Sequence, residues 1–85
     1  MKEIIYSDQA KKFLVKADKN DARIILNKIE QYAENPHELK NKVKKLKGLP
    51  CYRLRVGDYR VIFSETGEVL FIEKIGLRGN VYRGV

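Results

Sequence analysis

Residues 52–63 read YRLRVGDYRVIF, and this stretch decides the fold. In its first five residues, apolar side chains alternate with arginines, a period of two that is typical of a strand with one buried face. Gly57 and Asp58 interrupt the alternation, and Gly followed by Asp is typical of a two-residue type II′ turn. We therefore predict a β-hairpin whose second strand returns antiparallel to the first.

The short turn also predicts which residues of the hairpin face each other. With Gly57 and Asp58 as the loop, Arg55 lies opposite Arg60, and Arg53 lies two residues away on the same face. Like charges directly across a strand pair are destabilising by up to about 1 kcal/mol relative to neutral pairs. The residues alone fit a solvated face on which the arginine stems cover apolar surface. The clustering of like charges supports the alternative, a site for an anion such as a phosphate.

The residues before the hairpin predict one strand and two helices. Residues 4–6 are a short apolar run typical of a strand, and Ser7 is a suitable N-cap for a helix with apolar positions at i, i+3, i+4 and i+7. After a polar break, Asn20 or Asp21 is expected to cap a second amphipathic helix that ends before Pro36. The short link between the two helices predicts an antiparallel helical hairpin.

The remaining segments complete a small sheet. Residues 38–48 are basic with few apolar positions, and we expect a loop or a short irregular helix there. Residues 69–75 are mostly apolar, as in a buried central strand, and residues 76–80 are expected to form a glycine-rich bend. The order β-α-α-β-β-β predicts an α+β fold in which the helical hairpin packs on a mostly antiparallel four-stranded sheet. Residues 1–85 are expected to form a single domain.

Charge is the main compositional indication of function. Eighteen Lys and Arg against eleven Asp and Glu give a formal net charge of +7, which favours a polyanionic partner. Residues 1–40 carry eight basic and seven acidic side chains, whereas residues 41–85 carry ten and four, a net of +6. Five of the six arginines lie in the second half, and arginine suits bidentate contacts with phosphate.

Composition also excludes several classes of protein. One Cys and one His cannot build a disulfide framework or the usual zinc site, so we expect no metal and no cofactor. No apolar run approaches the length of a membrane-spanning helix, and the N-terminus lacks the apolar core of a signal peptide. We therefore expect a cytoplasmic protein with no membrane partner.

Two stretches resemble the motifs of the RelE/ParE superfamily of bacterial toxin components. Residues 46–63, LKGLPCYRLRVGDYRVIF, resemble its L-x-G-x-x-x-Y-R-[IL]-R-x-G-x-Y-R-[IV] strand pair. Residues 75–83, IGLRGNVYR, resemble its I-G-x-R-x-x-V-Y terminus. The helical hairpin before them also matches in length and order, so the resemblance covers nearly the whole chain.

The resemblance implies a toxin of a type II toxin-antitoxin system. In the RelE branch, such a toxin is a metal-independent endoribonuclease that enters the ribosomal A site and cuts mRNA. The 2′-hydroxyl attacks the adjacent phosphate and leaves a cyclic phosphate and a free 5′-hydroxyl. The implied partners are a cognate antitoxin, in a toxin-antitoxin hetero-oligomer, and mRNA and rRNA. Two alternatives stay open: a ParE-type DNA gyrase inhibitor without nuclease activity, and a member that binds antitoxin or ribosomes without cleaving.

The resemblance also assigns roles to residues. The implied catalytic set is Arg55, Arg60, Arg78 and Tyr82, in which Arg60 and Arg78 would stabilise charge on a pentacovalent phosphate. Tyr82 would stack on a base or act as general base. Arginine does not deprotonate in proteins, so Arg55 cannot be the base. That role then falls to Tyr82, Lys45 or Lys47. The implied RNA-binding set is Arg53, Lys42, Lys44, Lys45, Lys47 and Arg83; the lysine run has the alternative reading of a solvated surface.

Overall fold

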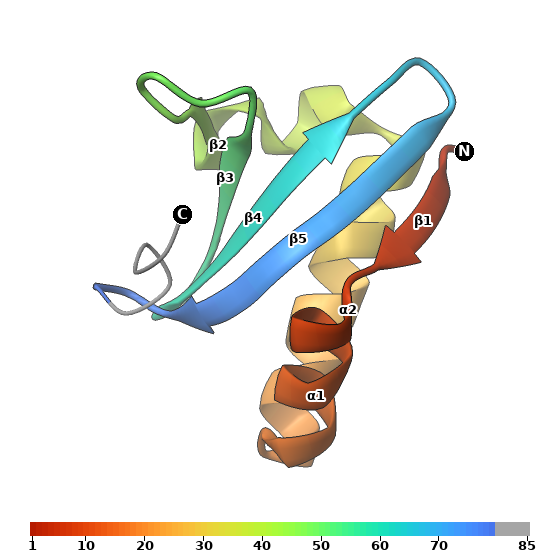
Figure 1. Cartoon of the computed structure of the whole chain (residues 1–85). Helices are drawn as coiled ribbons and strands as arrows, with labels where there is room; N and C mark the ends of the chain where they lie inside the picture. Colours follow the sequence, from red (N-terminus) through yellow and green to blue (C-terminus); the bar gives the residue numbers. More distant parts are fainter. Residues whose placement is uncertain (80–85) are drawn as a thin grey trace.

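A mixed five-stranded sheet and two α-helices make up the part of the chain that the computed structural model describes, residues 1–79 (Figure 1). The sheet order is β1-β5-β4-β3-β2; β1 is parallel to β5, and the other neighbours are antiparallel. The predicted α+β class is confirmed. The elements are β1 (Glu3–Tyr6), α1 (Asp8–Lys16), α2 (Lys19–Glu34), the 3-10 helix η1 (Pro36–Lys42), β2 (Val43–Lys45), β3 (Tyr52–Val56), β4 (Tyr59–Glu65) and β5 (Val69–Leu77).

Two details of the predicted sheet were wrong. The segment expected to be a loop or irregular helix is η1 followed by a fifth strand, β2, which pairs with the outer edge of β3. A three-residue strand is too short to show a period of two, so only its pairing partner reveals it. The bend expected from Gly76 starts later, because Gly76 pairs with Arg60 and β5 continues to Leu77.

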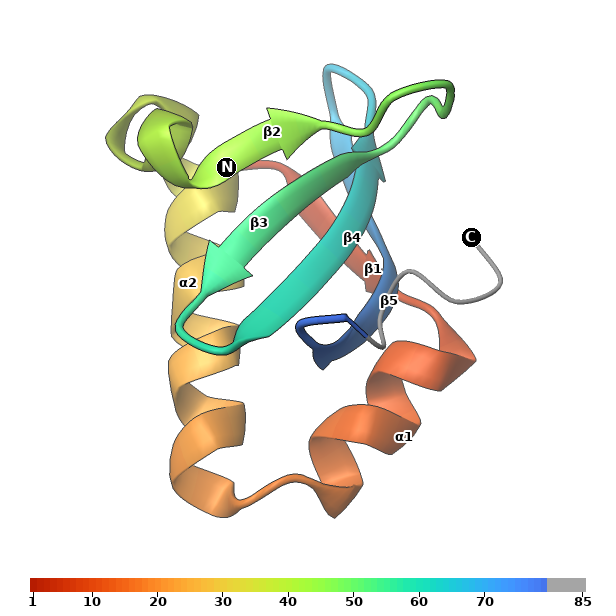
Figure 2. The ribbon, with the colours of Figure 1, turned by 90° about the vertical axis from the view of Figure 1, so that its left-hand side faces the viewer.

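The helices are capped by side chains at their N-termini. Ser7 caps α1 as predicted, since its Oγ accepts the Ala10 N–H at 3.1 Å. The cap of α2 is Asp18, not Asn20 or Asp21: Asp18 Oδ1 accepts the backbone N–H groups of both at 2.9 and 3.3 Å. The helices therefore join through two residues and diverge from that link (Figure 2). Neither they nor η1 is long and apolar enough to cross a membrane.

The core lies between the helices and one face of the sheet. Ile25 and Ile29 of α2 are fully buried and pack with apolar residues of β3, β4 and β5. Phe63 is at the aromatic centre of this core: its ring lies 4.9 Å from that of Tyr32 and stacks on that of Tyr52 at 5.5 Å. This packing fixes the orientation of the sheet, and none of the helices within residues 1–79 covers its other face.

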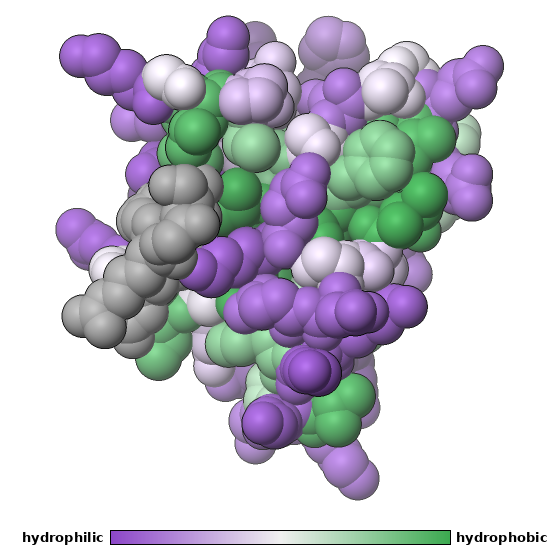
Figure 3. Space-filling model, in the orientation of Figure 1, coloured by the Kyte–Doolittle hydropathy of each residue, from purple (hydrophilic) through white to green (hydrophobic). Residues whose placement is uncertain are grey.

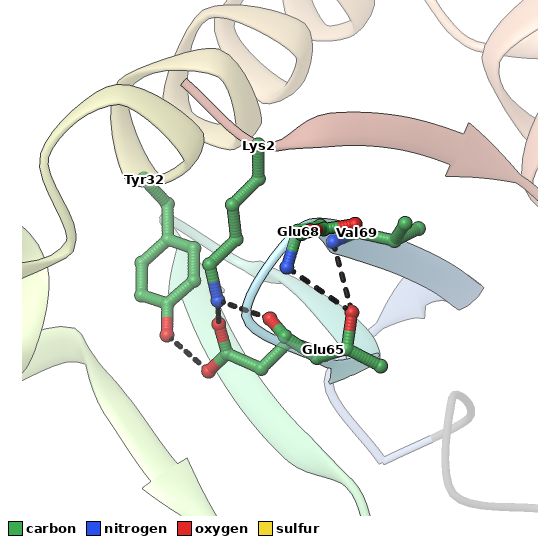
Figure 4. Close-up of polar contacts among 6 residues, drawn as sticks. Lys2, Tyr32, Glu65, Glu68 and Val69 are labelled. Carbon is green, nitrogen blue, oxygen red and sulfur yellow. Dashed lines mark hydrogen bonds and ion pairs between the residues drawn. The ribbon is translucent and has the colours of Figure 1, made fainter.

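A polar network closes one end of the core (Figure 4). The Tyr32 hydroxyl donates to Glu65 Oε2 at 2.7 Å, and Lys2 Nζ donates to Glu65 Oε1 and to the Thr66 carbonyl. Burial and the hydrogen bond to Glu65 raise the pKa of Tyr32 well above its ordinary value. The network therefore joins the N-terminus, α2 and the end of β4 through a neutral phenol and a charged carboxylate.

Candidate functional site

The hairpin of β3 and β4 presents its arginines on the face of the sheet that the helices do not cover. Arg55 pairs with Arg60, which confirms the predicted register, and Arg53 pairs with Ile62. Lys44 of β2 pairs with Arg53 and so joins them. We call Lys44, Arg53, Arg55 and Arg60 the arginine face. In Figure 1, α2 lies behind the sheet, and Figure 3 shows hydrophilic side chains across the middle of the face in view.

The loop of the hairpin has the predicted turn geometry. Gly57 has a φ of +58°, and no non-glycine residue among residues 1–79 has a positive φ, so Asp58 is on the negative side. A positive φ followed by a negative one is expected of a type II′ turn. The turn sets Val56 opposite Tyr59, and this fixes the arginines that follow on each strand.

Arg60 differs from its neighbours because it is almost buried, with 8% of its surface exposed. Its Nη1 donates to the carbonyls of Gly57 and Tyr59, each at 2.8 Å. The N–H groups on Nε and Nη2 of Arg60 have no hydrogen-bond partner within residues 1–79. The single ion pair in this part of the chain joins Lys2 and Glu65, so it does not involve Arg60. A buried guanidinium is usually paired with a carboxylate. Here backbone carbonyls hold the side chain, and no carboxylate within residues 1–79 pairs with its charge.

The other two arginines of the hairpin are less enclosed. Arg55 is exposed and Arg53 is half-buried. The backbone register places the three arginines on one face, as expected. Their guanidinium groups do not all converge, because the side chain of Arg60 turns back toward the loop. A uniformly solvated face, which the residues alone fit, does not describe Arg60.

Arg78 lies at the same end of the sheet. It is exposed in the turn after β5, as expected, and its backbone N–H donates to the Asp58 carbonyl at 2.9 Å. The segment after β5 is thus bonded directly to the hairpin loop (Figure 1). One loop therefore supplies the carbonyls that fix the Arg60 side chain and the Arg78 backbone.

The lysines expected to bind RNA do not share one face. Lys44 lies on the arginine face, but Lys45 pairs with Tyr52, whose ring packs against the core on the other side of the sheet. Lys42 ends η1 and is half-buried, and Lys47 is exposed between β2 and β3. The remaining expected site residues, Tyr82 and Arg83, lie outside the residues that the structure describes.

Lys74 is a basic residue that the sequence did not assign to the site. It pairs with Ile62, which itself pairs with Arg53, so Lys74 is on the arginine side of the sheet. Ile62 is 1% exposed although it lies outside the core cluster, and the long stems of such neighbours are suited to covering it. The register between β4 and β5 shifts at Ile62/Phe63. Because of this irregularity, strict alternation along the sequence does not predict the face on which Lys74 lies.

Three tyrosines of the structure have raised pKa values and are neutral near pH 7. The Tyr59 hydroxyl donates to Asp21 Oδ2 at 2.7 Å, and this hydrogen bond raises the pKa of Tyr59. Burial raises the pKa of Tyr6, as it does that of Tyr32. These three phenols are therefore poor general bases near neutral pH. Within residues 1–79, no three His, Cys, Asp or Glu side chains gather as a possible metal site.

Comparisons with known proteins agree with this architecture. The family model described as "ParE toxin of type II toxin-antitoxin system, parDE" matches residues 4–82. The archaeal RelE–RelB complex from Pyrococcus horikoshii OT3 contains a similar chain, with 30% identity and a TM-score of 0.77 over 94% of this chain and 98% of that chain. The RelB–RelE antitoxin-toxin complex from Methanococcus jannaschii has 23% identity and a TM-score of 0.73 over 95% and 98%. The intact E. coli RelBE toxin-antitoxin complex contains a chain with 24% identity and a TM-score of 0.72, over 91% of this chain and 96% of that chain. No curated protein matches the sequence significantly.

Proposed function

The chain belongs to the RelE/ParE superfamily, whose members are toxins of type II toxin-antitoxin systems, and from this premise we propose that it is a metal-independent, ribosome-dependent mRNA endoribonuclease that inhibits translation. The observation that carries the proposal is Arg60. Its guanidinium is nearly buried, is held by two carbonyls and has no carboxylate partner within residues 1–79. A fixed cation in a poorly solvated position is suited to stabilise the charge of a phosphate in a transition state.

In the proposed reaction, the ribose 2′-hydroxyl of the mRNA attacks the adjacent phosphorus. The hydroxyl proton passes to a general base, for which Tyr82 is our candidate, and the P–O5′ bond breaks. The leaving 5′-oxygen takes up a proton, so the products are a 2′,3′-cyclic phosphate and a free 5′-hydroxyl. Arg60 and Arg78 stabilise the pentacovalent phosphate, and Arg55 supports them from the strand opposite Arg60.

The rest of the arginine face holds the RNA backbone in this proposal. Arg53 and Lys44 form a cross-strand pair beside Arg55 and extend the positive surface toward the edge of the sheet. Lys42, Lys47 and Arg83 are proposed as peripheral contacts with mRNA or rRNA. Each contact with a phosphate should make the affinity more sensitive to salt, because binding releases counterions.

We also propose a cognate antitoxin as partner. The similar structure at 30% identity is that of a RelE–RelB complex, and a net charge of +7 favours an acidic segment of the antitoxin over the basic surface. Such a segment would occupy the arginine face with carboxylates in place of phosphates. The toxin and antitoxin are expected to form a hetero-oligomer.

A cleavage assay on ribosomes tests the nuclease. Purified protein is incubated with programmed ribosomes and end-labelled mRNA, and wild type is compared with Arg60→Gln, Arg78→Ala and Tyr82→Phe. We expect each arginine substitution to slow cleavage by about 100-fold or more, which is the usual effect of removing one hydrogen-bond donor that stabilises the transition state of an enzyme. Arg23→Gln is the matched control, because Arg23 is exposed on α2. Intact mRNA with wild-type protein would contradict the proposal.

Gyrase inhibition is the second candidate, because the family model that spans residues 4–82 is that of the ParE toxin. A supercoiling assay with DNA gyrase, run on the same protein preparation, separates the two functions. Blocked supercoiling together with intact mRNA would replace the nuclease by this candidate. If neither activity is found while an antitoxin still binds, the chain is a non-cleaving member.

A further inference from the structure

The hairpin loop that holds Arg60 is itself fixed from the opposite side of the sheet. Tyr59 immediately precedes Arg60, and its side chain points toward the helices, where its hydroxyl donates to Asp21 in the first turn of α2 at 2.7 Å. The backbone carbonyl of the same residue, Tyr59, accepts from Arg60 Nη1 at 2.8 Å. A short chain of bonds therefore runs from α2 through Tyr59 to the guanidinium.

The Tyr59 side chain packs against the core but is only partly enclosed in this position. A hollow of about 240 Å³ lies on one side, lined by residues that include Asp21, Ile24 and Asp58, and one of about 450 Å³ lies on the other. Tyr59 borders both hollows. Its one contact with another aromatic ring within residues 1–79 is a T-shaped pair with Phe13, at 5.7 Å between centroids. Backbone pairing of Tyr59 with Val56 and Leu77 holds the strands at this point, and the bond to Asp21 adds the polar restraint that links the end of the loop to α2.

We propose that Asp21 and Tyr59 are positioning residues, whose hydrogen bond fixes the β3–β4 loop so that its carbonyls hold Arg60 ready for a phosphate. The inference that Arg60 serves a phosphate rests on the proposed function, whereas the clamp on Arg60 does not. The Asp58 carbonyl of the same loop accepts from the Arg78 N–H, so the clamp also fixes the start of the segment after β5. Neither Asp21 nor Tyr59 touches the RNA in this proposal.

NMR of the arginine side chains tests the clamp without any RNA. In ¹⁵N-arginine-labelled protein, the exchange of the Arg60 Nε–H and the rotation of its Nη groups report how firmly the guanidinium is held. With Tyr59→Phe we expect both to quicken by roughly tenfold to a hundredfold, the change that corresponds to losing one hydrogen bond to a carboxylate. The exposed Arg55 and Arg23 should keep their rates. Unchanged Arg60 rates would overturn the proposal.

Two further variants separate positioning from general stability. Asp21→Ala removes the acceptor, and the double variant with Tyr59→Phe should be no worse than either single one, because the same bond is lost. Tyr6→Phe is the matched control, since the Tyr6 hydroxyl has no hydrogen bond to a side chain within residues 1–79 and lies on β1. Additive effects on Arg60, or an equal effect of Tyr6→Phe, would contradict a specific clamp.

The ribosomal assay adds the functional arm. Tyr59→Phe should lower kcat for cleavage on the ribosome more than it raises KM, because Arg60 then spends less time in the productive position. If wild-type protein cleaves nothing and the Arg60 rates still respond to Tyr59→Phe, the clamp stands and the nuclease fails. If cleavage by wild type and Tyr59→Phe is equal while Arg60→Gln is inactive, the positioning role is wrong.

Discussion

The polar network at the end of β4 allows a quantitative test by Tyr32→Phe, which removes one hydroxyl and leaves the ring on Phe63. The lost hydrogen bond has a charged acceptor, Glu65, at 2.7 Å, and Tyr32 is 6% exposed. Hydrogen bonds to charged groups contribute about 1.5–3 kcal/mol. Glu65 keeps its bond to Lys2, so we expect a destabilisation of about 2 kcal/mol at pH 7. This is a large share of the roughly 4–13 kcal/mol typical of a domain of this size.

The same substitution should matter less in alkaline solution. In the unfolded chain the phenol ionises near pH 10, whereas burial and Glu65 raise the pKa of Tyr32 in the folded protein. Above pH 10 the unfolded wild type therefore binds fewer protons than the folded one, and stability falls as pH rises. At pH 11 this effect is about 1.4 kcal/mol, and the Phe variant lacks it. The difference between the two proteins should thus shrink from about 2 to about 0.6 kcal/mol.

Urea unfolding followed by far-UV circular dichroism at pH 7 and pH 11 gives both free energies, in a chain that has no tryptophan. Other tyrosines ionise in both proteins and cancel in the difference. Tyr52→Phe is the control, because its ring also stacks on Phe63 while its hydroxyl has no hydrogen bond within residues 1–79. A difference below about 0.5 kcal/mol at pH 7, or one that does not fall by pH 11, would refute the account of this network.

Four other substitutions give separate tests. Phe63→Ala should lower the free energy of unfolding by about 3–5 kcal/mol, since Phe63 is 1% exposed. A midpoint temperature close to that of the wild type in a thermal melt would contradict this. Ser7→Ala should lower it by about 0.5–2 kcal/mol through the lost N-cap, with Ser7→Thr as the tolerated control in the same melts. Gly57→Ala meets no atom within 4 Å, so its expected loss of about 1–2 kcal/mol in urea titration comes from the φ of +58° alone. Lys44→Gln should reduce the slope of log affinity against log salt for single-stranded RNA by about 0.7, and an unchanged slope would remove Lys44 from the interface.

The parts of the structure that the sequence predicts well are governed by local geometry. A two-residue turn leaves one possible register, so the pairing of Arg55 with Arg60 follows directly from the positions of Gly57 and Asp58. The cap of α2 was misplaced because Asp18, Asn20 and Asp21 are all good caps, and nothing local decides which of them begins the helix.

The parts that it misses depend on distant segments. Strand β2 exists because the edge of β3 is available to it, and Lys74 joins the arginine side of the sheet through a shift in the register of β4 and β5. The alternation of apolar and basic residues places Arg60 on the face without helices. The side chain is nevertheless buried, because it turns toward the hairpin loop and donates to a backbone carbonyl there. The Tyr59–Asp21 bond links residues 38 positions apart, and no periodicity predicts such a contact.

The two ends of strand β4 have different roles: one carries the proposed catalytic arginine, and the other carries the polar network that stabilises the fold. Arg60 is its second residue and Glu65 its last, five residues apart, which corresponds to about 17 Å along an extended strand. A face with like charges in cross-strand positions destabilises the fold, and the paired carboxylate, lysine and phenol at the other end contribute in the opposite direction. The two ends share no side-chain contact, so their perturbations should be independent. Tyr32→Phe should weaken folding and leave RNA cleavage by the folded fraction intact, whereas Arg60→Gln should slow cleavage by about 100-fold or more in protein that still folds.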